Sequence, residues 1–272
     1  MFRKKETTAI SKEQAEFLHR TQRRKNAVGI LQVLLLVLFF IIWEIAAACS
    51  WIDSFLFSRP TELFTTAIKM VQDGSLFLHI GTTLWETVVG FLLGTILGTL
   101  TAILLWWNPF ISDVAEPYLV ILNSLPKTAL APIIIVWFGN NQSSIIIVAL
   151  LTSVVVTILS VLNGFLQVDE SQIKLIQIFG GNKAQVLTKV VLPANIPCIL
   201  NALKINVGLS FVGVIVGEFL VAQKGLGFLI VYSSQTFAMR VVLLSVVILA
   251  ILSALMYRAI ALLERRFRSW QG

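Results

Sequence analysis

Charged residues are scarce in this chain. Asp, Glu, Lys and Arg make up only 13% of its 272 residues, whereas soluble globular domains carry about 25%. Hydrophobic residues account for 57%, and they form apolar stretches long enough for several membrane spans of roughly 20 residues each. This balance excludes an ordinary soluble domain and predicts an all-α integral membrane protein.

Cysteine and histidine are almost absent as well. The two cysteines, Cys49 and Cys198, lie in or beside apolar stretches without metal-ligand spacing, so we expect neither a disulfide framework nor a redox site. The two histidines, His19 and His79, lie outside the expected spans. No span contains a Ser-Gly nucleophile motif or a pair of metal ligands. We therefore expect no catalytic residues, no metal site and no enzyme.

The net charge of +7 is concentrated near the two ends of the chain. Eight of the 21 Lys and Arg residues lie between Arg3 and Lys25, and four lie between Arg258 and Arg268. Such end-loaded charge orients a membrane protein and does not form a nucleic-acid-binding stripe. We expect residues 1–26 to be a solvated cytoplasmic tail, with a short surface helix starting at Ser11 as the alternative. Residues 265–272 form the second cytoplasmic tail.

Six spans account for the apolar stretches. We expect them at about residues 28–49, 82–107, 117–138, 145–166, 194–221 and 241–263. Residues 27–76 contain the first span and an outer amphipathic helix that begins at Pro60. Residues 77–264 form the core, with a turn at Asn108–Pro109. The apolar segment 228–232 is too short to span and is interpreted as a partly inserted hairpin.

Glycines recur at helical spacing within two of these spans. Gly90, Gly94 and Gly98 lie four residues apart in the second span, and Gly213 and Gly217 repeat that spacing in the fifth. Small residues at this spacing let another helix approach closely. We expect both rows to be helix-packing surfaces within the chain.

Several polar residues interrupt the spans. A Lys in mid-span costs about 2.5–3.5 kcal/mol on insertion scales, so it should face protein or a water-filled path. The third span also contains prolines, which free backbone carbonyls. Glu44 and Lys204 lie near span ends and are expected to satisfy local groups. Glu218 is as well suited to stabilising an outer loop as to gating. The candidates for a translocation path are Asn123, Ser124, Pro126, Lys127 and Glu218.

The longest polar interruption is Val168–Pro193. Its apolar residues recur at helical spacing, with charged residues between them. Gly180–Gly181 should divide the segment into two short helices, and Pro193 should end the second. Because spans flank it on both sides, we expect it to lie on the membrane surface, where a soluble partner can press against it.

This segment resembles the coupling loop of binding-protein-dependent ABC transporter permeases. The family signature is Glu-Ala-Ala, three residues, Gly, nine residues, Ile, any residue and Leu-Pro. Gly180 takes the glycine place, Val190 the Ile place, and Leu192–Pro193 the last pair. Lys174–Ile176 replaces the Glu-Ala-Ala element, which puts the usual acidic contact with the ATPase in doubt. Two further segments, Leu125–Gly139 and Val212–Phe237, look like the nitrate, sulfonate and taurine branch.

The resemblance implies a type I importer permease fold with six transmembrane helices in a bacterial cytoplasmic membrane. It also implies a second permease copy, two ATPase subunits that bind ATP and Mg, and an external substrate-binding protein. This chain lacks the phosphate-binding motif G-x-x-x-x-G-K-[ST], so the ATPase must be separate. The residues expected to couple to it are Glu170, Lys174, Ile176, Phe179, Gly180, Gly181, Leu192 and Pro193.

The resemblance also limits the substrate. It implies import of a small anionic or polar compound such as an aliphatic sulfonate, taurine or nitrate. The alternatives are the same permease role with a thiamine-precursor pyrimidine, or an ion-coupled secondary transporter. A secondary transporter would usually contain internal repeats, and none is evident in this sequence.

Overall fold

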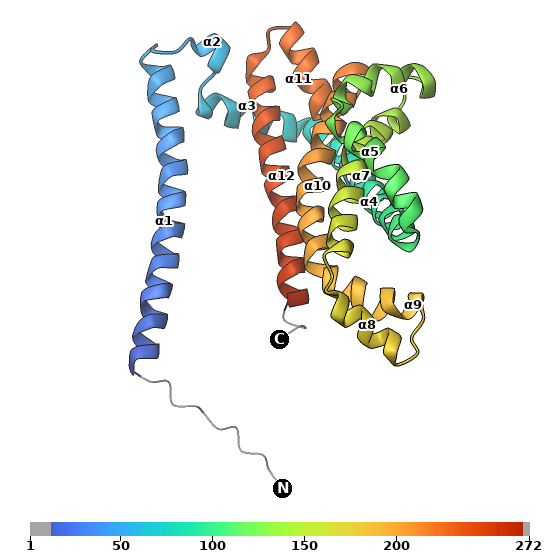
Figure 1. The fold of residues 1–272 in the computed structure, drawn as a ribbon. Coiled ribbons are helices and arrows are strands. Elements are labelled where there is room, and N and C mark those ends of the chain that lie inside the picture. Colours follow the sequence, from blue (N-terminus) through green and yellow to red (C-terminus); the bar gives the residue numbers. More distant parts are fainter. Residues whose placement is uncertain (1–11, 269–272) are drawn as a thin grey trace. The chain divides into compact units, whose positions relative to one another are not determined.

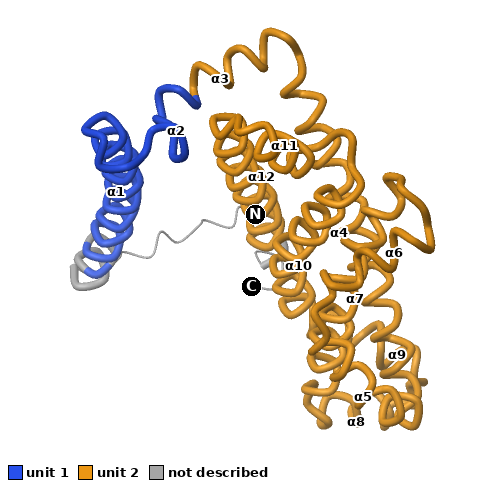
Figure 2. The backbone as a smooth tube through the Cα atoms, turned by 90° about the horizontal axis from the view of Figure 1, so that it is seen from above, with its two compact units in different colours: residues 1–63 blue, residues 64–272 orange. Residues whose placement is uncertain are grey.

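The computed structural model describes residues 12–268, and nearly all of them lie in helices (Figure 1). The described part contains no β-strand. The chain divides into two compact units, residues 1–63 and residues 64–272 (Figure 2). These units are treated separately below.

The first unit is dominated by one long helix, α1 (Lys12–Ala48), followed by the short helix α2 (Ser54–Phe57). The helical start at Lys12 differs from the solvated tail expected over residues 1–26. Residues 12–26 contain no Gly or Pro and are rich in Lys, Arg, Glu and Gln, which lose little rotamer freedom in a helix. Helix α1 therefore continues beyond its apolar part. Ser11, the alternative start of a surface helix, lies outside the described residues.

Glu44 connects the end of α1 to the start of α3 (Pro60–Gln72). Its carboxylate accepts hydrogen bonds from the Thr61 backbone N–H at 3.1 Å and from the Thr61 hydroxyl at 3.0 Å. The first N–H groups of a helix have no partner within the helix, and negative charge is favourable there. Glu44 thus has the local structural role expected for it.

The second unit contains the remaining helices. In chain order they are α4 (Ser75–Trp107), α5 (Pro109–Ser124), η1 (Lys127–Leu130), α6 (Ala131–Phe138), α7 (Gln142–Leu166), α8 (Glu170–Ile178), α9 (Lys183–Val186), η2 (Leu187–Val191), α10 (Leu192–Val221), α11 (Leu226–Gln235) and α12 (Met239–Arg268). Across both units, five of the described helices are long and apolar enough to cross a membrane, or six if one bent pair counts as a span. The expected all-α membrane fold is confirmed.

The expected third span, residues 117–138, is not one straight helix. The chain turns by 86° between α5 and the η1–α6 segment. Helix α5 begins at Pro109, where the Asn108 side chain accepts a hydrogen bond from the Ile111 N–H, so no extended loop precedes it. The break falls at Leu125, whose backbone is extended. Pro126 explains this, because a proline disfavours the helical conformation of the residue before it.

Pro193 does not end the second helix of the polar segment, contrary to expectation. Helix α9 continues through the π-helical turn η2 directly into α10. In this turn the Leu192 N–H donates to the Leu187 carbonyl, five residues back. A π-helical turn widens the backbone locally, which accommodates a proline that lacks an N–H.

Two other boundaries also differ from expectation. The segment 228–232 lies within helix α11 and is not a hairpin. Helix α4 begins at Ser75, so His79 lies near the start of the helix that continues as the expected second span. In both places the helix also includes polar residues, which an apolar pattern alone does not assign to a helix.

Helices α4, α7 and α10 form the centre of the second unit and lie side by side (Figures 1 and 2). A Cβ atom at Gly90 would lie 2.7 Å from Ala149 Cβ, and one at Gly98 would lie 2.5 Å from Thr157 Cβ. A Cβ at Gly213 would lie 2.5 Å from Ala149 Cα. Real Cβ atoms do not approach so closely, so these glycines set the distance between the helices. Gly94 and Gly217 face Ser153 and Ile145 of α7 in the same way.

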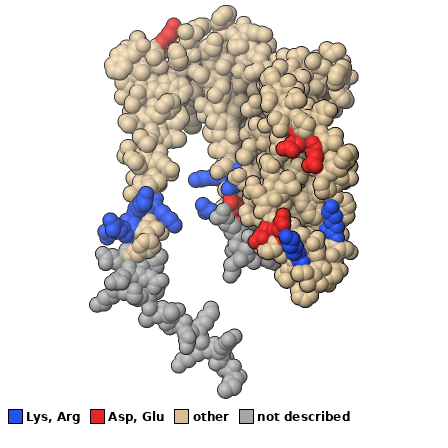
Figure 3. All heavy atoms as spheres, in the orientation of Figure 1, with Lys and Arg blue, Asp and Glu red and all other residues tan. Residues whose placement is uncertain are grey.

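Lys and Arg side chains are unevenly distributed over each unit. On the face shown in Figure 3, Lys and Arg of the second unit gather at the end that carries α8, α9 and the C-terminal part of α12. In the first unit they gather near the N-terminal part of α1. This distribution fits a multi-pass membrane protein, because charge is costly in the hydrocarbon region.

Adding a side chain at Gly98 should separate α4 from α7. We expect Gly98→Leu to destabilise the purified protein by about 1–3 kcal/mol, the usual cost of overpacking. Gly81→Leu is the matched control, because no atom outside the local helix lies within 4 Å of a Cβ at Gly81. Thermal unfolding in detergent would measure the difference. Equal unfolding temperatures for both variants would contradict the packing role.

Candidate functional site

Helices α8 and α9 form a short helical hairpin between α7 and α10. Asp169 caps α8 by accepting a hydrogen bond from the Ser171 N–H at 2.8 Å, and this bond holds the pKa of Asp169 below its usual value. Glu170 and Lys174 form an exposed ion pair at 2.9 Å. Their hydrogen bond lowers the pKa of Glu170 and raises that of Lys174. Both groups are therefore charged at neutral pH and open to a partner.

The hairpin turn is a Schellman motif centred on Gly180. The Gly181 N–H donates to the Ile176 carbonyl and the Gly180 N–H to the Gln177 carbonyl, both at 2.9 Å, which is the bonding pattern of that motif. Gly180 has φ = 75°, a left-handed conformation that suits glycine. Gly181 packs closely against Ile176. The glycine pair therefore divides the segment as the sequence predicts.

The second half of the hairpin is held by a capping box. The Gln185 N–H donates to Asn182 Oδ1, and the Asn182 N–H donates to Gln185 Oε1, each at 2.9 Å. These reciprocal bonds satisfy two donors that would otherwise lack partners. Helix α9 therefore starts at a fixed position directly after the turn.

One face of the hairpin is fastened to the helix core. Val186, Leu187 and Val191 are buried in a cluster with Phe165 of α7 and Ala102 of α4. Ile173 and Ile176 pack against the same cluster. Because apolar side chains of α8, α9 and η2 share one core with α4 and α7, the hairpin is anchored along its length.

The opposite face of the hairpin exposes apolar side chains at its tip. Ile178 is 81% exposed and Phe179 is 82% exposed, directly before the glycine turn. The tip of this polar surface element is therefore apolar. Phe179 and Glu170 thus lie on the exposed side, whereas Ile176 belongs to the anchored side.

A lysine ties the hairpin to the end of α4. The Lys183 ammonium donates a hydrogen bond to the Trp107 carbonyl at 2.6 Å and lies 5.5 Å and 5.9 Å from the ring centroids of Trp106 and Trp107. The carbonyls at a helix C-terminus carry partial negative charge, and aromatic faces attract cations. The sequence analysis did not assign a role to Lys183, because its partners are 76 residues away.

At the other end of the core, a buried polar cluster joins α4 and α10 to the loop before α11. We call it the distal cluster; it consists of His79, Thr83, Glu86 and Glu218. Glu218 is 1% exposed, and its Oε1 accepts from the Thr83 hydroxyl at 2.7 Å. Its Oε2 accepts from the Gly227 N–H at 2.5 Å. The carboxyl thus connects two helices to the loop.

The distal cluster caps helix α11. Besides the Gly227 bond, the Leu226 N–H donates to Thr83 Oγ1 at 2.8 Å, and the Gly225 N–H donates to His79 Nδ1 at 3.0 Å. Three N–H groups at the start of one helix are therefore satisfied by side chains. A Cβ atom at Gly227 would lie 2.8 Å from Glu218 Cβ. The glycines of this loop let the carboxyl approach the backbone.

Glu86 is a member of the cluster that the sequence analysis missed. It lies in α4 and is 2% exposed. Its carboxyl lies beside the side chains of Gln142 and Glu218. The signal was present in the sequence, since Glu86 is an acidic residue within the expected second span.

The other candidate path residues lie at the break between α5 and η1. The Lys127 ammonium donates to the Asn123 carbonyl at 3.0 Å and to Asn123 Oδ1 at 3.4 Å, so it binds a carbonyl freed by the break. Asn123, Ser124 and Pro126 are exposed on the surface of this chain. These candidate residues are therefore neighbours at one break in the chain. Glu218 lies far from them in the sequence and belongs to the distal cluster.

Lys204 forms a buried ion pair. Its ammonium contacts the carboxylate of Glu264 in α12, and both side chains are less than one fifth exposed. The pair connects α10 to the C-terminal part of α12. Lys204 therefore neutralises a charge locally, in line with the structural role expected for it.

Comparison with known proteins identifies this architecture. Residues 90–269 match the model of the family described as "binding-protein-dependent transport system inner membrane component". This range covers more than half of the chain and includes the whole α8–α9 hairpin. The chain belongs to this family.

Relatives of the permease cover nearly its whole length. A Bacillus subtilis (strain 168) permease named for aliphatic sulfonate transport is 25% identical over 97% of this chain and 96% of its own. The taurine transport system permease protein of Escherichia coli (strain K12) is 26% identical over 90% of both chains. The formylaminopyrimidine transport permease protein of Halalkalibacterium halodurans is 29% identical over 88% of this chain and 94% of its own.

Solved structures of similar fold come from ABC transporters. The MetNI methionine ABC transporter in an inward-facing conformation has a TM-score of 0.60 at 21% identity, covering 70% of this chain and 94% of the other. An amino acid ABC transporter has a TM-score of 0.56 at 18% identity, covering 73% of this chain and 97% of the other. The likeness supports the type I importer permease fold expected from the sequence.

Removing the Lys183 ammonium should loosen the hairpin from α4. We expect Lys183→Met to increase amide hydrogen exchange of residues 183–191 and of the last turn of α4 about fivefold, corresponding to a lost link of about 1 kcal/mol. Lys189→Met is the control, because Lys189 is an exposed lysine of the same segment. Indistinguishable exchange in the two variants would show that the link contributes nothing.

Removing the Glu218 carboxyl should release the start of α11. We expect Glu218→Ala to lower the stability of the purified permease by about 1–3 kcal/mol, because the buried Gly227 N–H and Thr83 hydroxyl lose their acceptor. Glu218→Gln should lose less, since its amide oxygen can still accept one of these bonds. Thermal unfolding and hydrogen exchange at residues 225–228 measure the effect. If both variants matched the wild type, the capping role would be refuted.

Proposed function

We propose that this permease is the transmembrane subunit of an ATP-driven importer, and that the α8–α9 hairpin couples it to a separate ATPase. The observation that carries the proposal is the two-sided character of the hairpin. Its tip exposes Ile178 and Phe179, whereas Val186, Leu187 and Val191 fasten it to the helix core. A surface element with an apolar contact face and a fixed base is suited to receive force from a partner.

The route of that force follows the helices attached to the hairpin. Helix α7 enters it and α10 leaves it. Movement of the hairpin by ATPase subunits would tilt these helices as rigid bodies, the kind of switch that alternates access in transporters. Glu170, Lys174, Phe179, Gly180 and Gly181 would form the contact region with the ATPase. Leu192 and Pro193 would lie where α9 and η2 join the transmembrane helix.

The complete transporter would contain a second permease copy, two ATPase subunits that bind ATP and Mg, and an external substrate-binding protein. Asn123, Ser124, Pro126 and Lys127 are polar or helix-breaking residues at the break in the bent span. Such residues are favourable in a membrane only where they face protein or water. We place these four residues along a path completed by the second copy, and Glu218 behind it as a buried group that holds the start of α11.

The proposed location is the bacterial cytoplasmic membrane, with both chain ends and the hairpin on the cytoplasmic side. The gathering of Lys and Arg near these parts within each unit supports this orientation (Figure 3). The coupling hairpin and the chain ends would then share a compartment with the ATPase. The distal cluster would face the outside, where the substrate-binding protein delivers its cargo.

The proposed substrate is a small anionic or polar compound, such as an aliphatic sulfonate, taurine or nitrate. The names of relatives from Bacillus subtilis and Escherichia coli favour a sulfonate. The relative from Halalkalibacterium halodurans favours a formylaminopyrimidine as the second candidate. Uptake into vesicles that contain the full transporter, with each compound in turn, separates these possibilities. Solute movement by the purified chain alone, without ATPase, would refute the coupled mechanism.

Gly180 offers a test of coupling that separates backbone conformation from bulk. No atom lies within 4 Å of a Cβ at Gly180, but its φ of 75° strains most side chains. Asn tolerates this conformation, whereas a β-branched residue does not. We therefore expect Gly180→Val to reduce uptake per ATP hydrolysed several-fold, and Gly180→Asn to remain close to the wild type. The measurement is uptake and ATP hydrolysis in reconstituted vesicles, with co-purification of the ATPase as the assembly control. Equal coupling ratios in both variants would contradict the hairpin's role.

A further inference from the structure

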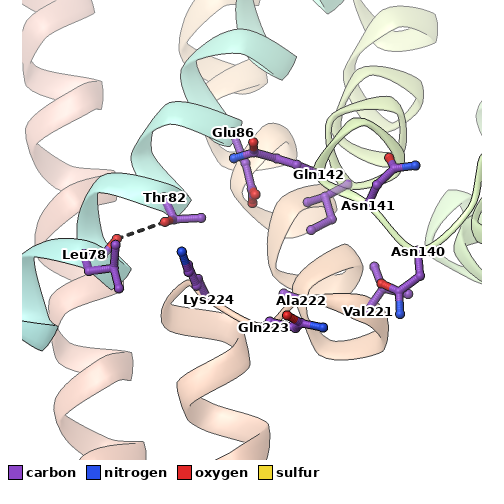
Figure 4. Close-up of a pocket in the computed structure, with 11 residues that line it drawn as sticks. Leu78, Thr82, Glu86, Asn140, Asn141, Gln142, Val221, Ala222, Gln223 and Lys224 are labelled. Atoms are coloured by element: carbon purple, nitrogen blue, oxygen red, sulfur yellow. Dashed lines mark hydrogen bonds between the residues drawn. The ribbon is translucent and has the colours of Figure 1, made fainter.

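The distal end of the core contains a pocket that shares Glu86 with the distal cluster. Its volume is about 450 Å³, within the range of small-molecule sites. Its walls come from α4, from the start of α7 with the loop before it, and from the loop between α10 and α11 (Figure 4). We call it the distal pocket.

Glu86 provides an unused acceptor at the wall of this pocket. Its Oε2 is buried and has no hydrogen-bond partner among the described residues. The neighbouring Glu218 differs, because both of its oxygens accept hydrogen bonds. Two acidic groups side by side in a buried position are unfavourable unless a positive charge or a proton offsets them. Within the described part of the chain, no Lys or Arg forms an ion pair with Glu86.

The pocket supplies a positive charge at a different point. Lys224 lies in the loop between α10 and α11, is exposed, and lines the pocket together with Asn140 and Gln223 (Figure 4). It does not pair with Glu86 in this conformation. The pocket therefore presents an acidic group, Glu86, on α4 and a basic group, Lys224, on the loop between α10 and α11. Neutral amide side chains also line it.

We propose that the distal pocket binds a small zwitterion, with its ammonium group at Glu86 and its anionic group at Lys224. The ammonium would donate to the unused Glu86 Oε2, and its positive charge would offset the two neighbouring acidic groups. Gln142 lines the pocket beside Glu86 and is exposed (Figure 4), so its side chain can move aside to admit the ligand. The inference rests on the proposed import function, because the ligand is taken to be the transported solute on its way in.

A matched pair of probes tests the proposal. 2-Aminoethanesulfonate and ethanesulfonate share the anionic group and differ in the ammonium. Binding of each labelled probe is measured to the full-length permease in nanodiscs, without substrate-binding protein or ATP. We expect the wild type to bind 2-aminoethanesulfonate at least about tenfold more tightly than ethanesulfonate, the usual effect of a charged hydrogen bond.

Two variants separate the two ends of the pocket. Glu86→Gln should abolish the preference for 2-aminoethanesulfonate, whereas the control Glu116→Gln, an exposed acid on α5, should keep it. Lys224→Ala should weaken both probes while the preference persists, and this loop variant remains informative if Glu86→Gln fails to fold. Equal binding of both probes to the wild type, or no binding of either, would overturn the proposal. An unchanged preference in Glu86→Gln would do the same.

The same experiment distinguishes this inference from the proposed function. ATP-dependent uptake by the full transporter is measured in parallel with the binding. If the full transporter takes up solute with ATP but the permease binds both probes equally, the importer function stands and the zwitterion site is refuted. If the permease prefers 2-aminoethanesulfonate but the full transporter shows no ATP-dependent uptake, the zwitterion site stands and the importer function is refuted.

Discussion

The close approach of α4, α7 and α10 is the constraint on which the rest of the structure depends. Lipid tails are as apolar as the helix surfaces, so packing contacts hold membrane helices together where water-driven burial cannot. Gly90, Gly94 and Gly98 remove side chains from one face of α4, and Ala149, Ser153 and Thr157 of α7 occupy the space. Polar groups can then bond across the short distance; Asn206 Nδ2, for example, donates to Thr157 Oγ1 at 2.6 Å.

The sequence predicted the fold class and the composition of the hairpin because those features are local. Apolar length determines a span, glycine spacing determines a close helix contact, and the pair Gly180–Gly181 determines a turn. The prediction from sequence was wrong where the backbone conformation depends on several residues together. Pro193 looked like a helix end, yet a π-helical turn absorbs it. Pro126 lay inside an apparently continuous span, yet the chain bends there by 86°.

The candidate sites were predictable to different degrees for the same reason. The surface character of the α8–α9 hairpin follows from its polar residues and its place between spans. The distal cluster could not be assembled from sequence, since Thr83 and Glu218 lie 135 residues apart. Glu218 was recognised as a membrane-embedded charge, but the neighbouring Glu86 was not, although it too is an acidic residue within an expected span. The contacts of Lys183 and Lys204 with residues far away in the sequence could likewise not be predicted from the sequence pattern.

One continuous helical stretch connects the two ends at which function is proposed. Lys183–Val221 comprises 39 residues, a length of about 60 Å for an α-helix. At its start, Lys183 bonds to the end of α4, and near its finish Glu218 bonds to Thr83 in the first half of α4. Two helices joined at both ends resist sliding past each other, so a push on the hairpin tends to rotate the pair as one body. The glycines of the α10–α11 loop lie at the far end of that body. Tilting of α10 would therefore move the wall of the distal pocket that carries Lys224 relative to the start of α7, where Gln142 covers Glu86.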